Sequence, residues 1–255
     1  MDLAEHQMMG YDRAITLFSP DGRLLQVEYA KKTVRQGSTA IGLTCKEGVV
    51  FITDKRIVDP LIVPEDVEKI FEIDSHIGAT AAGIISDARV LIEKAQVTAQ
   101  QHKVTYNIPI DVLTVVKDVC SLKQVCTQSG GLRPFGVSLI IGGIDLNQEP
   151  RLYETDPTGI FFRCYASVIG EGETKVEEFL QKNYKYELSL DDTIRLGFTA
   201  LTKVLPQGFN LNRIDIALIP TKTKQFESLG QDKIKQYFQQ IKGNKKKDDD
   251  KKDKA

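Results

Sequence analysis

Three side chains with different chemistry stand together near the start of the chain, at Tyr11, Asp12 and Arg13. They supply an aromatic hydroxyl, a carboxylate acceptor and a guanidinium donor within three residues. Tyr and Arg are enriched at protein interfaces, where such groups form hydrogen bonds and ion pairs. A chain terminus, by contrast, is often the least ordered part of a domain. Two interpretations are therefore open, an interface element and a locally packed terminus.

The cysteines and histidines are not spaced like metal ligands. No two of the four cysteines form a C-x-x-C pair, and the chain has only three histidines. A structural zinc site needs about four such ligands at characteristic spacings. We therefore expect no metal and no other cofactor, and we expect the cysteines to be small buried side chains in a reducing compartment. The residues concerned are Cys45, Cys120, Cys126, Cys164, His6, His76 and His102.

Two further sequence patterns contain residue types that could do chemistry, but their spacing indicates structural roles. The stretch IGEGET, residues 169–174, lacks the G-x-x-x-x-G-K spacing of a phosphate-binding loop, so it predicts a turn and a helix start. The acid pairs at residues 177–178 and 191–192 stand near predicted helix starts, where the helix dipole favours negative charge. We give them no acid–base role.

Composition excludes several classes of protein. The 255 residues carry a formal net charge of −1, with 41% hydrophobic and 27% charged residues. A protein that binds nucleic acid or a membrane surface would show a basic face or a long apolar run, and neither is visible. The first ten residues, MDLAEHQMMG, lack the basic and apolar regions of a secretory signal. We therefore expect a globular cytoplasmic protein that contacts neither nucleic acid nor membrane.

The order of predicted elements indicates the fold class. Strands come in runs and helices in pairs, which favours an α+β sandwich of two sheets with helices on both faces over a doubly wound sheet. Predicted strands occupy a hairpin at 38–56 and residues 69–73, 76–83, 135–143, 150–156, 159–170 and 213–219. Predicted helices cover 86–103, 111–128, 174–184, 189–205 and about 231–242.

Several helix starts can be assigned to particular residues. Asp111 and Ser189 precede apolar-periodic segments and are predicted N-caps, and either Ser86 or Asp87 is predicted to cap the helix over 86–103. The last twelve residues, NKKKDDDKKDKA, form a run of charges that we expect to be disordered. We divide the chain into a leading segment 1–35, a folded domain 36–243 and a charged tail 244–255.

The leading segment contains its own helix. Residues 19–22, Ser-Pro-Asp-Gly, form a turn and helix-start signal, after which apolar residues recur at helical spacing. This narrow stripe favours packing on the edge of the sandwich or on a neighbouring subunit. Its members are Leu24, Val27, Ala30 and Val34.

An ordered set of long motifs resembles one family. YDRAITLFSPDGRLLQVEYA, GSTAIGL, EKIFEID, QQHKVTY and GGLRPFGVSL occur in this order between residues 11 and 140. The chain resembles the α subunits of 20S proteasomes, most closely the archaeal type, from about residue 11 to residue 219. The resemblance implies a four-layer αββα fold of the N-terminal-nucleophile hydrolase family. It also implies seven-membered α rings that template and cap rings of catalytic β subunits.

The resemblance gives the leading segment a role as a gate. Tyr11, Asp12, Pro20 and Tyr29 match the positions at which α subunits form an open-gate cluster, and Arg13 stands beside them. In that cluster a Tyr hydroxyl meets an Asp carboxylate across adjacent subunits. Local packing of the two tyrosines is the alternative interpretation.

The resemblance also implies a docking pocket and a channel loop. Lys69 matches the pocket lysine that receives the C-terminal carboxylate of an ATP-dependent unfoldase, and Gly37 and Ile84 match the pocket's apolar wall. The segment SGGLRPFG, residues 129–136, matches the loop that narrows the channel. In that loop we single out Ser129, Gly130, Gly131 and Leu132; Ser129 departs from the aromatic residue common in relatives, and a plain helix end would also explain the glycines.

Two rival functions follow from the same sequence. Catalytic relatives expose an N-terminal Thr whose free amine is the base for its own hydroxyl; here the matching residue is Ser38, with Asp54 and Lys69 near the accompanying positions. Cleavage after Gly37 would discard the whole leading segment, and without cleavage Ser38 has no free amine. We therefore predict no catalytic residue and no enzymatic activity of the chain itself. A peptide-binding or scaffold module unrelated to proteolysis is the third possibility.

Overall fold

The computed structural model describes residues 9–252 except residues 58, 60 and 207. Its strands form two five-stranded sheets of antiparallel pairs, with the orders β10-β9-β2-β1-β8 and β3-β4-β5-β6-β7. The strands are β1 (Ala40–Cys45), β2 (Gly48–Asp54), β3 (Ile70–Asp74), β4 (Ile77–Gly83), β5 (Val137–Ile144), β6 (Pro150–Thr155), β7 (Phe161–Arg163), β8 (Ala166–Ile169), β9 (Ile214–Pro220) and β10 (Glu227–Ser228).

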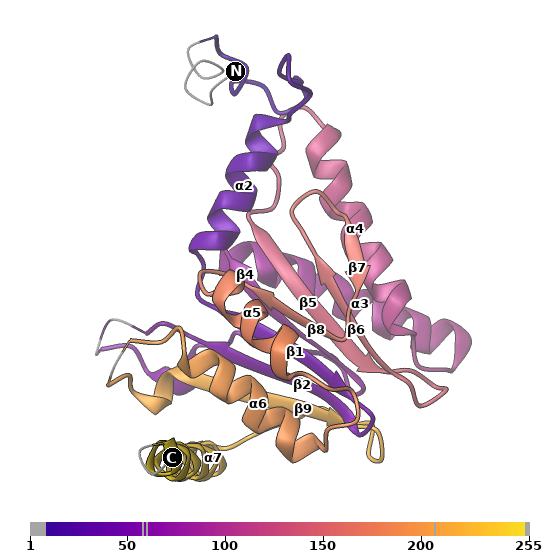
Figure 1. The fold of residues 1–255 in the computed structure, drawn as a ribbon. Helices are drawn as coiled ribbons and strands as arrows, with labels where there is room; N and C mark the ends of the chain where they lie inside the picture. Colours follow the sequence, from indigo (N-terminus) through magenta and orange to yellow (C-terminus); the bar gives the residue numbers. More distant parts are fainter. Residues whose placement is uncertain (1–8, 58, 60, 207, 253–255) are drawn as a thin grey trace.

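Helices lie outside both sheets, which gives four layers (Figure 1). Helices α3 and α4 share a core with the second sheet, and α5, α6 and α7 share one with the first. The predicted α+β sandwich is therefore confirmed. The helices are α2 (Leu25–Gln36), α3 (Ile85–Tyr106), α4 (Val112–Gln128), α5 (Glu173–Asn183), α6 (Leu190–Thr202) and α7 (Gln231–Lys252), with short 3-10 turns η1 (Pro64–Asp66) and η2 (Leu211–Arg213).

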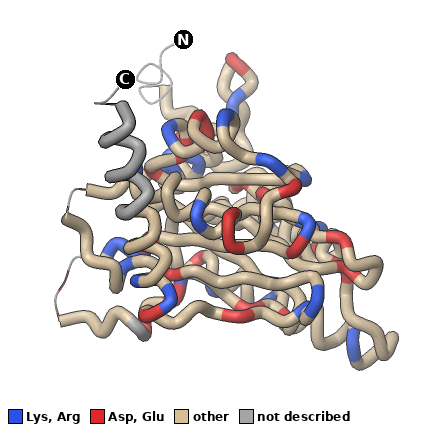
Figure 2. Tube along the Cα trace, turned by 60° about the horizontal axis from the view of Figure 1, so that its bottom comes forward, with Lys and Arg blue, Asp and Glu red and all other residues tan. Residues whose placement is uncertain are grey.

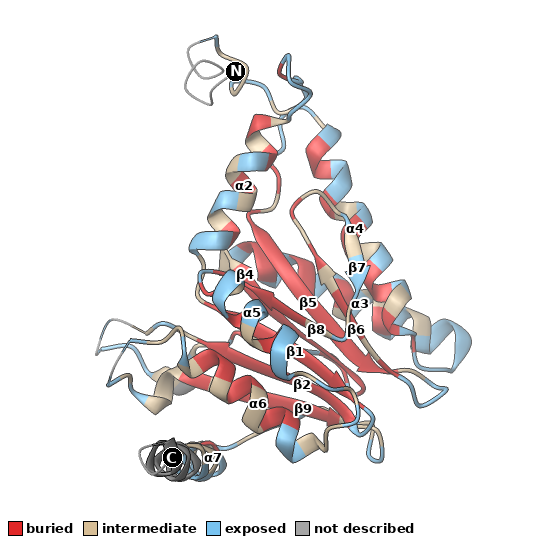
Figure 3. Cartoon of the chain, viewed as in Figure 1, coloured by how far each residue is buried: buried red, intermediate tan, exposed pale blue. Residues whose placement is uncertain are grey.

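A third apolar cluster fills the space between the two sheets. Phe51 and Val49 of the first sheet meet Ile140 and Leu152 of the second. At Gly42 the sheets approach so closely that a Cβ atom would lie 2.6 Å from Ile140 Cγ2. Because both faces of each sheet are covered, the central strands β2 and β5 are buried at every residue, as Figure 3 shows.

Two of the predicted helix caps are confirmed and one is wrong. The Asp111 carboxylate accepts a hydrogen bond from Thr114 N at 2.9 Å, and Ser189 Oγ accepts one from Asp192 N at 3.2 Å. Helix α3, however, begins one residue before Ser86, and Ile84 occupies its N-cap without a side-chain hydrogen bond. Asp87 lies in the first turn instead, because its carboxylate is bound by a guanidinium from another segment, a stronger partner than a helix N–H.

Helix α2 lies over one end of the sandwich, where it packs on β4 and β5 (Figure 1). Three of the four residues in its predicted apolar stripe are buried, and the fourth, Leu24, is the N-cap residue and only half-buried. Leu25 is buried in its place, at 1% exposure. The helix therefore fixes the start of the chain to the interior strands β4 and β5 of the second sheet.

Three of the cysteines are buried as predicted, but Cys164 is only partly buried. Cys164 follows the short edge strand β7, where no further strand covers it. All four are free thiols. Among the described residues, no group of three His, Cys, Asp or Glu side chains is arranged to hold a metal ion.

The C-terminal helix is longer than expected. A helix ending near residue 242 and a disordered tail over 244–255 were predicted, whereas the backbone of α7 remains helical to Lys252. Residues 253–255 lie outside the described part of the chain.

Charges of both signs are interspersed over the domain, and Figure 2 shows no extended region of one sign along the described trace. This matches the formal net charge of −1. Within the part of the chain that the structure describes, no helix has the length and apolar content that a membrane span requires.

Candidate functional site

The arm, which we define as residues 9–24, stands beyond the N-terminal end of α2 (Figure 1). Asp12 anchors it, because its carboxylate Oδ2 accepts a hydrogen bond from the Tyr29 hydroxyl at 3.3 Å and its carbonyl accepts one from Gln26 Nε2 at 2.5 Å. Tyr11 is half-buried beside Asp12. The resemblance implied a Tyr–Asp contact between adjacent subunits, whereas here Tyr29 and Asp12 meet within one chain.

A tight turn leads from the arm into α2. Ser19 N donates to Arg23 O at 2.9 Å, Arg23 N donates to Ser19 Oγ at 3.2 Å, and Gly22 N donates to Ser19 O at 2.8 Å. Gly22 has φ of +74°, a conformation that favours glycine. Pro20 lies exposed in this turn, and Arg13 is also exposed. These two predicted gate residues therefore present their side chains to the surface of the single chain.

The channel loop, residues 129–136, lies beside the arm. Ser129 ends α4, where its N–H donates to Val125 O, and Gly131 follows with φ of +86°. A Cβ atom at Gly130 or Gly131 would meet nothing within 4 Å, so the positive φ and not crowding requires glycine at residue 131. Arm residues 13–16 and loop residues 130–134 line one shallow concavity of about 380 Å³, with Leu132 half-exposed.

Lys69 is the centre of a second cluster, at the nucleophile position. Its Nζ donates to Ser38 Oγ and Ser38 O, each at 2.6 Å, to Asp54 O at 2.9 Å and to Thr39 O at 3.2 Å. Lys69 is 3% exposed. We call this group, with Arg213, the Lys69 centre. The resemblance matches Ser38, and approximately Asp54 and Lys69, to residues of catalytic relatives, so the protonation and bonding of the centre decide what chemistry it can do.

Burial lowers the pKa of Lys69 to about 7. Desolvation is the largest cause; the Asp54 carboxylate opposes it, and the positive charges of Arg56 and Arg213 add to it. A lysine with such a pKa exchanges its proton near neutrality, so it can donate to or accept from the Ser38 hydroxyl.

Asp54 is paired with Arg213 and not with Lys69. Arg213 Nε and Nη2 donate to the two carboxylate oxygens at 2.5 and 2.6 Å, and Arg56 N donates to Oδ1 at 2.9 Å. Only the main-chain carbonyl of Asp54 contacts Lys69. Sequence reasoning missed Arg213, because 159 residues separate it from Asp54 and no local pattern joins the two.

Ser38 sits inside a firmly held stretch of main chain. The Gly37 carbonyl accepts a hydrogen bond from Glu171 N at 2.8 Å, and the Ser38 carbonyl accepts one from Lys69. Gly170 packs so tightly here that a Cβ atom would lie 2.7 Å from Ser38 O. Since the nitrogen of Ser38 is an amide within the chain, it cannot act as the base that an N-terminal nucleophile requires.

A polar cleft of about 820 Å³ opens next to the Lys69 centre, but it does not reach the hydroxyl. Thr39 and the Asp54–Arg213 pair line it, together with the ion pair between Arg56 and Glu171. Neither Ser38 nor Lys69 is among its lining residues. The remaining lining residues are Gly172, Thr174, Lys175, Lys203, Val204, Leu205 and Pro206.

The three residues predicted for a docking pocket converge in the fold. Gly37 lies against Gly83, where a Cβ atom would be only 2.3 Å from Gly83 N, and Ile84 follows directly. Lys69 is bonded to Ser38, the neighbour of Gly37. In the single chain, however, the Lys69 ammonium is buried against four oxygen atoms and does not face an open apolar wall.

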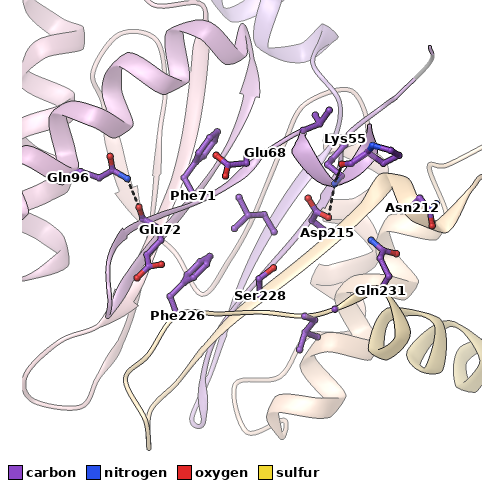
Figure 4. Close-up of a pocket in the computed structure, with 15 residues that line it drawn as sticks. Lys55, Glu68, Phe71, Glu72, Gln96, Asn212, Asp215, Phe226, Ser228 and Gln231 are labelled. Atoms are coloured by element: carbon purple, nitrogen blue, oxygen red, sulfur yellow. Dashed lines mark hydrogen bonds and ion pairs between the residues drawn. The ribbon is translucent and has the colours of Figure 1, made fainter. Parts of the chain in front are cut away.

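A separate groove of about 580 Å³ lies where the edge strands β3 and β10 of the two sheets come near each other. Figure 4 shows the Lys55–Asp215 ion pair, 3.1 Å apart, at one side of the groove and the rings of Phe71 and Phe226 at the other. Lys55 Nζ also donates to Pro64 O at 2.6 Å. Burial raises the pKa of Asp215 and Lys55 opposes the shift. The ion pair braces the loop after β2, and no pattern in the sequence indicated it.

Two protein-family models match this sequence, one over the folded domain and one over the leading segment. Residues 34–219 match the proteasome subunit family, and residues 11–32 match the N-terminal signature of the A-type subunits of the proteasome.

Curated archaeal proteins match most of the chain. The proteasome alpha subunit of Pyrococcus horikoshii is 46% identical over 91% of this chain and 88% of its own length. That of Methanosarcina acetivorans is 45% identical over 91% and 94%, and that of Archaeoglobus fulgidus is 46% identical over 91% and 93%. The chain therefore belongs to the proteasome subunit family and carries the N-terminal signature of its α-type members.

Proposed function

We propose that this chain is a non-catalytic α subunit of the 20S proteasome core, and that seven copies form an outer ring. The ring templates and caps a ring of catalytic β subunits in the cytoplasm, gates the passage of substrates and docks ATP-dependent unfoldases. One observation carries the proposal: Ser38 lies within continuous main chain, where Lys69 bonds Ser38 and Glu171 N bonds the Gly37 carbonyl, behind a segment that matches the α-type signature.

The gating role rests on the way the arm is attached. Hydrogen bonds from Gln26 Nε2 and the Tyr29 hydroxyl to Asp12 connect residues 9–24 to α2, and the Tyr29–Asp12 bond of 3.3 Å is long for a charge-assisted one. Such bonds contribute about 1.5 to 3 kcal/mol when well formed. Seven arms around one pore would act together, so that a small bias in each subunit switches the order of the whole collar. A heterologous contact that closes on itself gives such a ring.

The docking role rests on Lys69, Gly37 and Ile84. A compact ammonium suits a chain-terminal carboxylate, and the preceding apolar residue of a tail needs a wall. The tail carboxylate would have to compete with Ser38 for Lys69, because the four oxygen atoms already occupy its donors. Since Lys69 also braces Ser38, Thr39 and Asp54, loss of activation on Lys69→Ala alone would not separate docking from folding.

Deleting the start of the arm tests the gating proposal. The full chain and a chain of residues 14–255 are each co-expressed with a β subunit, and hydrolysis of a small peptide is measured on particles of matched size. The truncated particle is expected to hydrolyse the peptide several-fold faster, because a barrier has been removed. Equal rates in the two particles would reject the gate, and a lasting monomer in gel filtration would favour an isolated binding module.

A self-processing serine hydrolase is the second candidate, favoured by the 2.6 Å contact between Lys69 and the Ser38 hydroxyl. A lysine with a pKa of about 7 could accept the hydroxyl proton. Ser38 is not among the residues that line the cleft beside the centre, however, and its nitrogen is an amide within the chain. Peptide hydrolysis by the purified chain alone, abolished by Ser38→Ala, would establish this activity; none is expected.

A further inference from the structure

Asp87 joins the first turn of α3 to the channel loop. Its Oδ1 accepts a hydrogen bond from Arg133 Nη2 and its Oδ2 accepts one from Nη1, each at 2.6 Å, and Oδ2 also accepts one from Gly136 N at 2.9 Å. Asp87 is 7% exposed, whereas Arg133 lies at the surface. A bidentate pair between guanidinium and carboxylate fixes orientation as well as distance.

The electrostatics of Asp87 favour its charged form. Burial by itself would raise the pKa of the carboxyl, but the hydrogen bonds from Arg133 and Gly136 and the charge of Arg133 outweigh it, so the pKa is lowered. Arg133 responds in the opposite sense, and its pKa is raised mainly by the bond to Asp87. The pair is therefore fully charged at neutral pH.

A second set of contacts ties the same two segments. Ile84 N donates to Gly136 O at 2.9 Å, so Gly136 is bonded through both its carbonyl and its N–H to the start of α3. The packing is close, because a Cβ atom at Gly136 would lie 2.8 Å from Ile84 Cδ1 and would require that side chain to shift. Residues 84–87 and 133–136 thus share four hydrogen bonds, all within one turn of helix.

We propose that Asp87 is the positioning residue of the channel loop, and that it makes the loop and the wall around Ile84 one rigid body. Its functional consequence rests on the proposed function, in which Ile84 borders the docking pocket and residues 129–136 border the channel. In that setting Asp87 holds the exposed Arg133 side chain back from the bore. An activator tail that displaces the wall would carry the loop with it.

The ordering of the loop can be tested without reference to gating. Asp87→Asn removes the charge, and Arg133→Lys keeps it but cannot form the two-pronged bond. The matched control is Asp118→Asn, because Asp118 Oδ2 accepts a hydrogen bond from Thr98 Oγ1 at 2.7 Å and ties α4 to α3 without touching the loop. Amide hydrogen exchange of residues 129–136, measured on the assembled particle, is the readout.

Exchange at Gly136 is expected to be at least tenfold faster in Asp87→Asn than in the wild type, with a smaller increase in Arg133→Lys and none in Asp118→Asn. Unchanged exchange in Asp87→Asn, or an equal increase in the control, would overturn the proposal. If Asp87→Asn fails to fold, the same criterion applies to Arg133→Lys, which retains the Asp87 charge.

The effect on the channel is tested in particles whose arm has been deleted, so that the gate plays no part. The particles contain residues 14–255 of this chain together with β subunits. In them we compare the rate of hydrolysis of an unfolded protein with that of a tetrapeptide. Asp87→Asn is expected to lower the ratio of these two rates at least threefold, because the released Arg133 side chain obstructs a chain-sized substrate. An unchanged ratio would overturn the functional consequence. If deletion of the arm does not accelerate peptide hydrolysis by the wild-type particle, the proposed gate is rejected. The amide exchange measurement then decides the role of Asp87 by itself.

Discussion

Ser38 of the Lys69 centre follows the arm within a few turns of chain, yet the centre and the arm are bound in different ways. In the Lys69 centre, four oxygen atoms surround one buried ammonium, and a bidentate ion pair joins Asp54 to Arg213. The arm is mostly exposed, and the long bond between Tyr29 and Asp12 is one of its anchors. The main chain around Ser38 is thus held by strong, short bonds, whereas the segment ahead of it lies largely at the surface.

The two regions differ in the chemistry that is open to them. The Ser38 hydroxyl is only partly buried, but it is bonded to Lys69 and the Ser38 nitrogen is an amide within the chain, so the hydroxyl lacks the base of an N-terminal nucleophile. An exposed segment with few contacts opens at low free-energy cost, which is what a switchable barrier requires. The comparison also predicts that equal substitutions in the two regions will have unequal consequences.

The largest expected contrast is between two aspartates. Asp54→Ala removes the partner of the largely buried Arg213, and breaking such a pair costs roughly 3 to 5 kcal/mol of unfolding free energy. Asp12→Ala removes the partly buried hydrogen bond to Tyr29 and is expected to lower the free energy of unfolding by no more than about 1 kcal/mol. Chemical denaturation of both variants measures the difference. Similar losses of unfolding free energy in the two variants would contradict the difference between the two regions.

A second contrast concerns pH. The unfolded chain keeps the Lys69 proton up to about pH 10.5, whereas the folded chain releases it near pH 7. Between these values the unfolded state binds more protons, so stability should rise with pH. Relative to Lys69→Met, the wild type is therefore expected to gain unfolding free energy from pH 7 to pH 10, measured by denaturation in urea. A difference between the two proteins that does not vary with pH would contradict the lowered pKa.

The smallest effect belongs to the arm. Tyr29→Phe removes the 3.3 Å hydrogen bond to Asp12, so the global unfolding free energy should fall by about 1 kcal/mol or less. Amide exchange of residues 9–13 should nevertheless accelerate, because an anchor of the arm has been removed. Unaltered exchange there would show that the hydroxyl plays no part in holding the arm.

Local patterns predicted the fold well and the paired charges poorly. Asp111 and Ser189 could be identified as caps because their partners lie three residues away. The ion pair between Asp54 and Arg213 spans 159 residues and that between Asp87 and Arg133 spans 46, so no spacing rule could find them. The ion pair with Arg133 also occupies the Asp87 carboxylate, which does not cap α3 as its position in the sequence predicted.

The gate residues illustrate a different limit. The resemblance placed Tyr11, Asp12 and Tyr29 in one cluster, and the fold of the single chain joins Asp12 to Tyr29. Contacts between subunits form only where the surfaces of two chains meet, so the structure of a single chain does not contain them. For the same reason the docking role of Lys69 stays a prediction, although Gly37, Lys69 and Ile84 lie close together.

The intact mass of the chain, measured in particles that hydrolyse peptides, tests most directly whether the nucleophile position is locked inside the chain. A locked position predicts a polypeptide that retains the segment before Ser38, apart from any removal of the initiator methionine, while the β subunits in the same particle carry the activity. A chain that begins at Ser38, shortened by 37 residues, would contradict it.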